Sequence, residues 1–214
     1  MRYLLLLAAL IISNAFAAPN FEETMAAAKD GDAIAQYNLG VMYDNGRGVP
    51  ENNAEAVKWY RKAADQGDAD AQFNVGLMYA NGDGVPENDA EAVKWFRKAA
   101  DQGNAIAQYN LGVMYDNGRG VPENNAEAVK WYRKAADQGD ADAQFNVGVM
   151  YANGDGVPEN DIRAYVWWSM AKTQGNAEAA KNLGILKPRM TKQQIAEAQA
   201  LAAQCYESDY KDCD

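Results

Sequence analysis

The sequence has 214 residues, of which 48% are apolar and 23% are charged, a composition typical of a folded soluble protein with a core. Its formal net charge is −10, which disfavours binding to nucleic acid and to anionic lipid, because both require clustered Lys and Arg side chains. It lacks His, which excludes Ser-His-Asp and Cys-His catalysis and His-based metal sites.

Residues 1–17 have the pattern of a secretory signal peptide. Arg2 precedes an apolar run from Leu4 to Ile12, and Ala15-Phe16-Ala17 is a small-x-small cleavage pattern. The alternative is a short membrane anchor, but this run is far shorter than the roughly 20 residues that cross a bilayer. We therefore expect an exported protein, periplasmic or extracellular, that does not insert into a membrane.

A unit of 36 residues recurs along the chain. The sequence also contains a longer exact repeat. The stretch YDNGRGVPENNAEAVKWYRKAADQGDADAQFNVG occurs at 43–76 and again, without change, at 115–148. Exposed and buried positions are copied alike, so this identity indicates a recent duplication of two units and does not show which residues matter. The recurring tetrapeptides are Tyr37-Asn38-Leu39-Gly40, Phe73-Asn74-Val75-Gly76, Tyr109-Asn110-Leu111-Gly112 and Phe145-Asn146-Val147-Gly148.

Each unit is predicted to form two helices. Asp32 caps a helix from Ala33 to about Asp44, and Asn45-Gly46 supplies a left-handed stop. After a loop, Asn53 caps a second helix from Ala54 to about Asp65. Each of the two helices has one apolar face, and the two faces are expected to pack together. The face of the first helix consists of Ala35, Leu39, Met42 and Tyr43, and the face of the second consists of Ala56, Val57, Tyr60, Ala63 and Ala64. Gly40 allows close approach, and Trp59 is expected to fill the gap towards a neighbouring pair.

A single helix pair cannot bury its aromatic residues alone, so the units are expected to stack into an all-α, right-handed solenoid. We place an N-terminal capping helix in 18–31, from Phe21 to Lys29. A closing helix from Met190 to Ala203, capped by Thr191, is separated from the array by Pro188. The repeats are placed at 32–67, 68–103, 104–139 and 140–175, followed by a partial fifth repeat and the closing helix with its tail in 176–214.

Cys205 and Cys213 are the two cysteines of the sequence. Export would bring them into an oxidising compartment, where a disulfide between them would staple the tail. The alternative is two free thiols.

The pattern AQYNLGVMYDNGRGV followed by AEAVKWYRKAADQG resembles the Sel-1-like repeat family, a relative of the tetratricopeptide repeats with a longer loop between its helices. The resemblance covers residues 32 to about 186, and MTKQQIAEAQALAAQC is similar to the family's C-terminal helix. It implies a non-enzymatic adaptor that binds other proteins, and many bacterial members are exported to the envelope. Some relatives that bind or hydrolyse β-lactams carry a Cys pair in each repeat, which this sequence lacks.

The first helices have a second face that the intra-unit packing leaves free. In tetratricopeptide-like arrays the first helices line the concave surface, so this face predicts a groove for a peptide or protein partner, neutral or basic in charge. Asn amides suit a peptide backbone, and aromatic rings offer flat apolar contact. Alternatively, the Asn residues tie one helix to the next and the aromatic residues are partly buried spacers. The predicted rows are Tyr37, Phe73, Tyr109 and Phe145; Asn38, Asn74, Asn110 and Asn146; and Val41, Leu77, Val113 and Val149.

Two features alternate from unit to unit. The loops carry Arg47, Asp83, Arg119 and Asp155, and the first helices end in Asp44 and Asp116 or in Ala80 and Ala152. A ligand could read this alternation, but a solvated rim inherited by copying explains it equally well.

We predict no catalytic residue, metal or cofactor. Ser169 and Lys172 match the Ser-x-x-Lys spacing of penicillin-recognising enzymes, but the companion Ser-Asp-Asn and Lys-Thr-Gly elements are absent from the sequence. Ser169 also stands where earlier units have Arg, and is expected on the exposed side of its helix. The alternatives to an adaptor are therefore a protein acting on cell-wall fragments or β-lactams, and an inhibitor that uses a loop.

Overall fold

The computed structural model describes residues 20–211 and 213, and the predicted signal peptide lies outside them. Within this part of the chain the regular structure is entirely helical. The helices are α1 Phe21–Lys29, α2 Ala33–Asn45, α3 Asn53–Asp65, α4 Ala69–Asn81, α5 Asp89–Asp101, α6 Ala105–Asp116, α7 Asn125–Ala136, α8 Ala141–Asn153, α9 Asp161–Thr173, α10 Ala177–Leu186, the short 3₁₀ helix η1 Lys187–Arg189, and α11 Lys192–Glu207.

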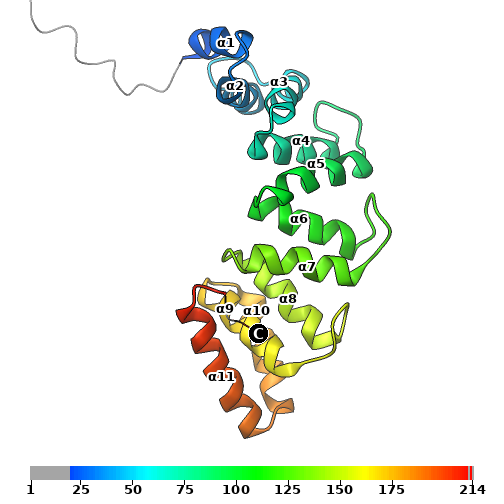
Figure 1. The fold of residues 1–214 in the computed structure, drawn as a ribbon, viewed down its shortest axis with the longest axis vertical. Coiled ribbons are helices and arrows are strands. Elements are labelled where there is room, and N and C mark those ends of the chain that lie inside the picture. The colour runs from blue at the N-terminus through cyan, green and yellow to red at the C-terminus, as the bar shows by residue number, and fades with distance from the viewer. Residues whose placement is uncertain (1–19, 212, 214) are drawn as a thin grey trace, which may run out of the picture.

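The helices form a solenoid of stacked hairpins, as predicted. Each helix packs mainly on its neighbours in sequence, and α11 returns to pack on α9. The result is an elongated array that bends into an arc, with α1 at one end and α11 at the other (Figure 1). Each unit therefore buries its apolar surface against the unit before it and the unit after it.

Local signals set the ends of the helices. The side chain of Asp32 caps α2, and Gly46 follows that helix with a φ of 67° in the left-handed region, as predicted. The predicted cap of the second helix is wrong by one residue, because Asn52 and not Asn53 caps α3. Asn52 has extended backbone, and its side chain accepts from the amide of Glu55 at 3.1 Å, so the helix begins at Asn53.

The close approach within each pair depends on a glycine in the first helix. A Cβ added to Gly40 would lie 2.5 Å from the ring of Tyr60. The same contact recurs with aromatic residues in the other three full repeats: Gly76 on Phe96, Gly112 on Tyr132 and Gly148 on Trp168. A second-helix ring thus packs directly against the first-helix backbone.

The second-helix tryptophan fills the space between units, as predicted. Trp59 packs in a cluster with Ala28 of α1 and Leu39 of α2. Trp95 lies in the buried cluster of the first unit, and Trp131 lies in that of the second. These side chains make each core continuous with the next.

A ladder of buried glutamines also joins successive helix pairs. Gln36 donates from Nε2 to the carbonyl of Ala28 at 3.1 Å, and its Oε1 accepts from Gln66 at 2.8 Å. Because both ends of each buried amide are paired, the ladder specifies the register of the stack without an unpaired polar group. The prediction missed this ladder, although a Gln at the same place in each of the four full repeats was a visible signal. Equivalent bonds form at Gln72, Gln108 and Gln144.

The C-terminal segment closes the array. Thr191 caps α11, as predicted, and does so in a reciprocal capping box with Gln194. The helix begins at Lys192 rather than at Met190 and runs to Glu207 rather than to Ala203. Cys205 and Cys213 form a disulfide. The bond holds the tail against the end of α11, where both cysteines are buried.

Gly76→Ala should destabilise the fold by about 1–3 kcal/mol, because the new methyl group overpacks against the Phe96 ring. Gly184→Ala is the matched control, since Gly184 lies inside α10 with nothing within 4 Å of an added Cβ. That change should stabilise by about 0.5–1 kcal/mol through helix propensity. Urea unfolding followed by circular dichroism measures both effects, and an equal response of the two variants would contradict the close-contact account.

Candidate peptide-binding groove

The predicted groove residues lie on α2, α4, α6 and α8 and are all half-buried. Beside them, Ile34 is 68% exposed and Ile106 is 53% exposed. These two residues occupy one position of the repeat, where the second and fourth units carry Asp70 and Asp142, so exposed apolar and acidic side chains alternate along this face. The half-buried set is Tyr37, Asn38, Val41, Phe73, Asn74, Leu77, Tyr109, Asn110, Val113, Phe145, Asn146 and Val149.

The aromatic row rests on the second helices. The ring of Tyr37 lies 5.8 Å from that of Tyr60, and the ring of Phe73 lies 5.9 Å from that of Phe96. One side of each groove aromatic therefore packs on its own unit, while the rest of the residue remains partly accessible. Burial raises the pKa of the Tyr37 phenol, and the nearby Asp70 carboxylate raises it further.

The asparagine row has two kinds of environment. Asn74 lies beside the phenols of Tyr37 in the preceding unit and of Tyr60 in that same unit, and its amide acts to lower their pKa values against the larger rise from burial; Asn146 stands in the same relation to Tyr109 and Tyr132. Asn110 follows Phe73, which has no hydroxyl, and donates instead to the carbonyl of Ile106 at 2.8 Å. Two of the four Asn residues thus help to join units, and their binding role stays a prediction.

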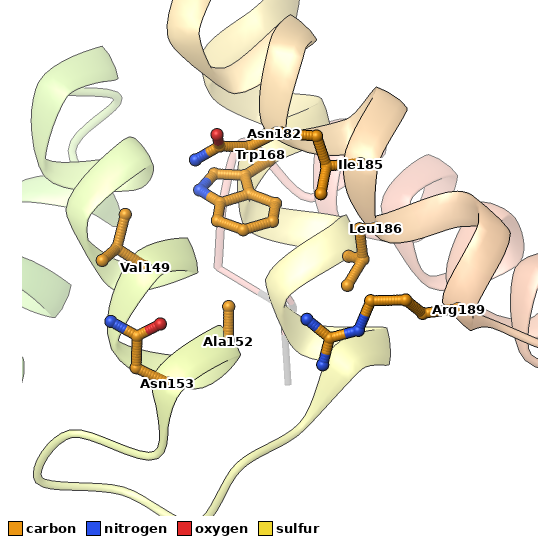
Figure 2. Close-up of a pocket in the computed structure, with 8 residues that line it drawn as sticks. All are labelled: Val149, Ala152, Asn153, Trp168, Asn182, Ile185, Leu186 and Arg189. Atoms are coloured by element: carbon orange, nitrogen blue, oxygen red, sulfur yellow. The ribbon is translucent and has the colours of Figure 1, made fainter.

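Two of the three rows continue into the fifth unit, whereas Lys181 stands where the aromatic row would continue. Asn182 stands one period after Asn146, and Ile185 stands one period after Val149. Ile185 is 60% exposed. Here the rows reach a pocket between α8, α9 and α10 (Figure 2). It is lined by Val149, Ala152, Asn153, Trp168, Asn182, Ile185, Leu186 and Arg189.

Pairs inside each unit explain one of the two alternations. The Tyr60 hydroxyl donates to Asp44 at 3.2 Å, and the Tyr132 hydroxyl donates to Asp116 at the same distance. In the second unit both partners change together, because Phe96 has no hydroxyl and Ala80 replaces the aspartate. The aspartates therefore accept a hydrogen bond from a buried phenol. The prediction that they belong to a solvated rim missed this contact.

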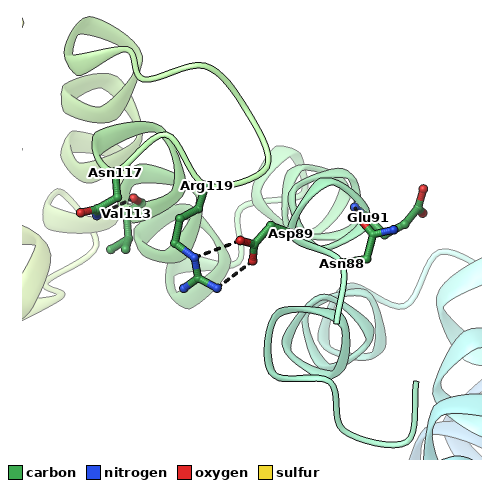
Figure 3. Close-up of polar contacts among 6 residues, drawn as sticks. All are labelled: Asn88, Asp89, Glu91, Val113, Asn117 and Arg119. Carbon is green, nitrogen blue, oxygen red and sulfur yellow. Dashed lines mark hydrogen bonds and ion pairs between the residues drawn. The ribbon is translucent and has the colours of Figure 1, made fainter. Parts of the chain in front are cut away.

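Pairs between units explain the other alternation. Arg119 in the loop of the third unit binds Asp89 at the start of α5 through two bonds of 2.7 and 3.1 Å (Figure 3). Where the next loop carries Asp155, the corresponding helix start is Asn125, which avoids two facing carboxylates. The loop and helix are close, because a Cβ on Gly156 would lie 2.4 Å from the Asn125 backbone. Loop charge is thus matched within the array.

The helix caps follow the same rule. Asn104, the cap of α6, donates to Asp70 of the preceding unit at 2.9 Å. The cap of α8 is Asp140, and the residue of the preceding unit that corresponds to Asp70 is Ile106. That position therefore does not place a second carboxylate opposite the Asp140 cap. Successive interfaces are therefore of two types, which repeat every 72 residues.

Asp89→Asn should destabilise the fold by about 0.5–1 kcal/mol, because it removes a partly exposed bidentate ion pair. Asn125→Asp should also destabilise, since it faces Asp155. Asn125→Asp combined with Asp155→Arg recreates the pair and should recover the loss. A double-mutant cycle in urea at low and high salt measures the coupling, and a coupling of zero would disprove the pairing rule.

Ser169 lies half-buried in α9, so its predicted position on the exposed side is wrong. Earlier units place Arg61, Arg97 and Arg133 at this position. Lys172 is exposed one turn later. Because α9 is continuous through this region, its local backbone amides are used within the helix and do not supply oxyanion donors beside Ser169.

The stacked helix pairs define a helical-repeat protein of the solenoid class. The family model described as the Sel1 repeat matches residues 33–68, 69–104, 105–140 and 141–176, and the chain belongs to this family. These matches begin one residue after the predicted repeats. The Sel1 repeat fold is commonly a protein–protein interaction scaffold, and the family is generally non-enzymatic.

Solved structures agree with this assignment. The protective antigen c5321 of uropathogenic Escherichia coli is 37% identical, with a TM-score of 0.79, and the match covers 89% of this chain and 41% of that one. A Sel1 repeat protein from Oxalobacter formigenes is also 37% identical, with a TM-score of 0.69 over 88% of this chain and 70% of that one.

The curated relative matches over a short stretch. A sel1-like repeat-containing protein of Acanthamoeba polyphaga mimivirus is 48% identical over 42 residues, which is 20% of this chain and 7% of that protein. In the described part of the chain, each helix is too short or too polar to span a bilayer.

Proposed function

We propose that this chain is an exported, non-enzymatic interaction module that binds a peptide or protein partner along the groove formed by α2, α4, α6 and α8. The single observation that carries the proposal is the placement of exposed apolar side chains. Of the four large apolar residues that are most exposed in the described part of the chain, Ile34, Ile106 and Ile185 project from first helices beside the predicted rows. A partner that covers them removes this apolar surface from water.

The partner is a neutral or basic chain. The net charge of −10 repels acidic partners and attracts basic ones, and Asp70 and Asp142 lie next to the groove tyrosines. An extended peptide suits the groove, because half-buried amides recur beside the aromatic rings in each unit. Net contributions of about 1 kcal/mol per hydrogen bond correspond to micromolar rather than nanomolar affinity.

The proposed location is periplasmic or extracellular. Two features support it: the signal-peptide pattern of residues 1–17, and the Cys205–Cys213 disulfide, which persists in oxidising compartments. The match to an E. coli protein described as a protective antigen is consistent with exposure outside the cytoplasm.

Site-specific photocrosslinking in living cells tests the groove. A benzoylphenylalanine at Asn110 lies in the groove, and one at Lys130 lies on the exposed side of α7 as a matched control. We expect a discrete crosslinked product from position 110 but not from position 130. Ile106→Ser should weaken that product several-fold without a change in thermal stability, because Ile106 is mostly exposed.

Crosslinking from position 130 alone would assign the partner to the other face. Equal products from both positions, or a product insensitive to Ile106→Ser, would overturn the groove assignment.

A further inference from the structure

The C-terminal end of the groove differs in charge from the rest. The first four units have Asn45, Asn81, Asn117 and Asn153 at one position, and the fifth unit has Arg189 there. Among the residues that line the pocket, Arg189 carries the charge. Its guanidinium points across the mouth of the pocket towards Ala152 and Asn153 (Figure 2). The groove therefore ends at a cationic group.

The interior of the pocket is mostly apolar. Val149, Ile185 and Leu186 contribute aliphatic surface, and Trp168 contributes one wall. The indole N–H of Trp168 is already bonded to the carbonyl of Phe145 at 3.1 Å, so the ring acts as an apolar wall rather than as a donor. The polar groups Asn153, Asn182 and Arg189 complete the lining.

A small residue helps to keep the space open. At the matching position of the third unit stands the larger Asp116, which accepts a hydrogen bond from the hydroxyl of Tyr132. In the fourth unit Ala152 stands there, opposite Trp168, and both line the pocket. The second unit also has Ala at this place, at Ala80, but the next first helix carries Asn117 where the fifth unit has Arg189. Within the repeats, the combination of a small residue, Ala152, with a guanidinium, that of Arg189, therefore occurs at the C-terminal end of the groove.

Arg189 is only loosely paired. Its Nη2 lies 3.5 Å from Glu159 Oε1 and 3.7 Å from Asp161 Oδ1, whereas Arg119 reaches Asp89 at 2.7 Å. Strong guanidinium–carboxylate bonds are about 2.7–2.9 Å long. The side chains of Arg189 and Glu159 are 55% and 60% exposed, so Glu159 can turn into water at little cost when another carboxylate arrives.

We propose that this pocket binds the last residue of a partner peptide, with its apolar side chain inside and its terminal carboxylate on Arg189. A C-terminal residue carries an apolar side chain and a carboxylate on the same carbon, which matches an apolar pocket with a guanidinium at its mouth. An internal Asp or Glu places its carboxylate on the side chain that must enter the pocket, so it fits worse. The amides of Asn182 and Asn153 bond the peptide backbone as it leaves the groove. The inference rests on the proposed function and specifies that the groove recognises the C-terminus of the partner peptide.

The test compares two probes that differ in one group. Acetyl-tetraalanyl-leucine with a free carboxylate and the same peptide with a C-terminal amide are titrated into the ¹⁵N-labelled protein. We expect the acid to shift the Trp168 indole signal saturably and to bind about tenfold more tightly than the amide, since a hydrogen bond to a charged group is lost in the amide. Equal affinity of the two peptides, or no shift of the indole signal by the acid, overturns the proposal.

Four variants separate the contributions. Arg189→Gln should lower the affinity for the acid to that of the amide, and Glu159→Gln should raise it about two- to threefold, because a competing carboxylate is removed. Ala152→Leu should block the pocket, while Ala80→Leu at the matching place of the second unit should leave binding intact. Arg189→Gln and Glu159→Gln both change exposed side chains, so they should fold and allow the peptide affinity to be measured even if a leucine variant does not fold. Wild-type affinity in Arg189→Gln overturns the proposal.

The two proposals can fail separately. If both peptides shift the signals of Asn74 and Asn110 equally, the groove binds peptide but its end does not read a carboxylate. If the crosslinking product from position 110 is absent while the acid peptide still shifts Trp168, the pocket binds but the groove assignment is wrong.

Discussion

The structure depends on the contact between a first-helix glycine and a second-helix aromatic ring. That contact brings the two backbones together, yet one pair of helices still leaves much of its aromatic surface uncovered. Each unit must therefore find a neighbour, and Trp95 and Trp131 show how the next unit supplies the missing packing. Local close approach and nearest-neighbour burial together produce a solenoid.

Polar pairing then sets which units can be neighbours. The glutamine ladder is the same at the four junctions from α1–α2 to α7–α8, whereas the ion pair of Arg119 with Asp89 and the bond of Asn104 with Asp70 occur at one type of junction. The buried amides of the ladder must be satisfied and so favour one register, whereas the exposed pairs make alternate junctions differ in their polar contacts. A block of 72 residues therefore contains one junction of each type. The sequence identity and the structural alternation share the same two-unit period.

The fold was largely predictable because repetition supplies its own evidence. Four copies of the caps, stops and apolar faces fix the helices, and the error at Asn52 arose because two adjacent Asn residues offer equally good caps by residue type alone. The site was less predictable. Whether Asn74 meets a ligand or the Tyr37 phenol depends on the distance between units, which the sequence of one unit does not contain. The pocket beside Arg189 was missed for a related reason, because the fifth unit is too divergent to be read as a full repeat.

The arc of stacked pairs relates this architecture to its proposed use. Each first helix contributes a few half-buried residues to the groove. These residues form a continuous surface only when neighbouring units keep their register. The exposed isoleucines on this surface gain nothing from the solenoid itself, and their burial by a partner would supply a favourable contribution that the isolated chain lacks.

Native-state hydrogen exchange of the Gly112→Ala variant is the most direct test of nearest-neighbour packing. If packing is between nearest neighbours, amide protection should fall most in α6 and α7, less in the adjoining α5 and α8, and little in α2, α3 and α11. A uniform loss of protection across all helices would show that the array unfolds as one unit and would contradict the account.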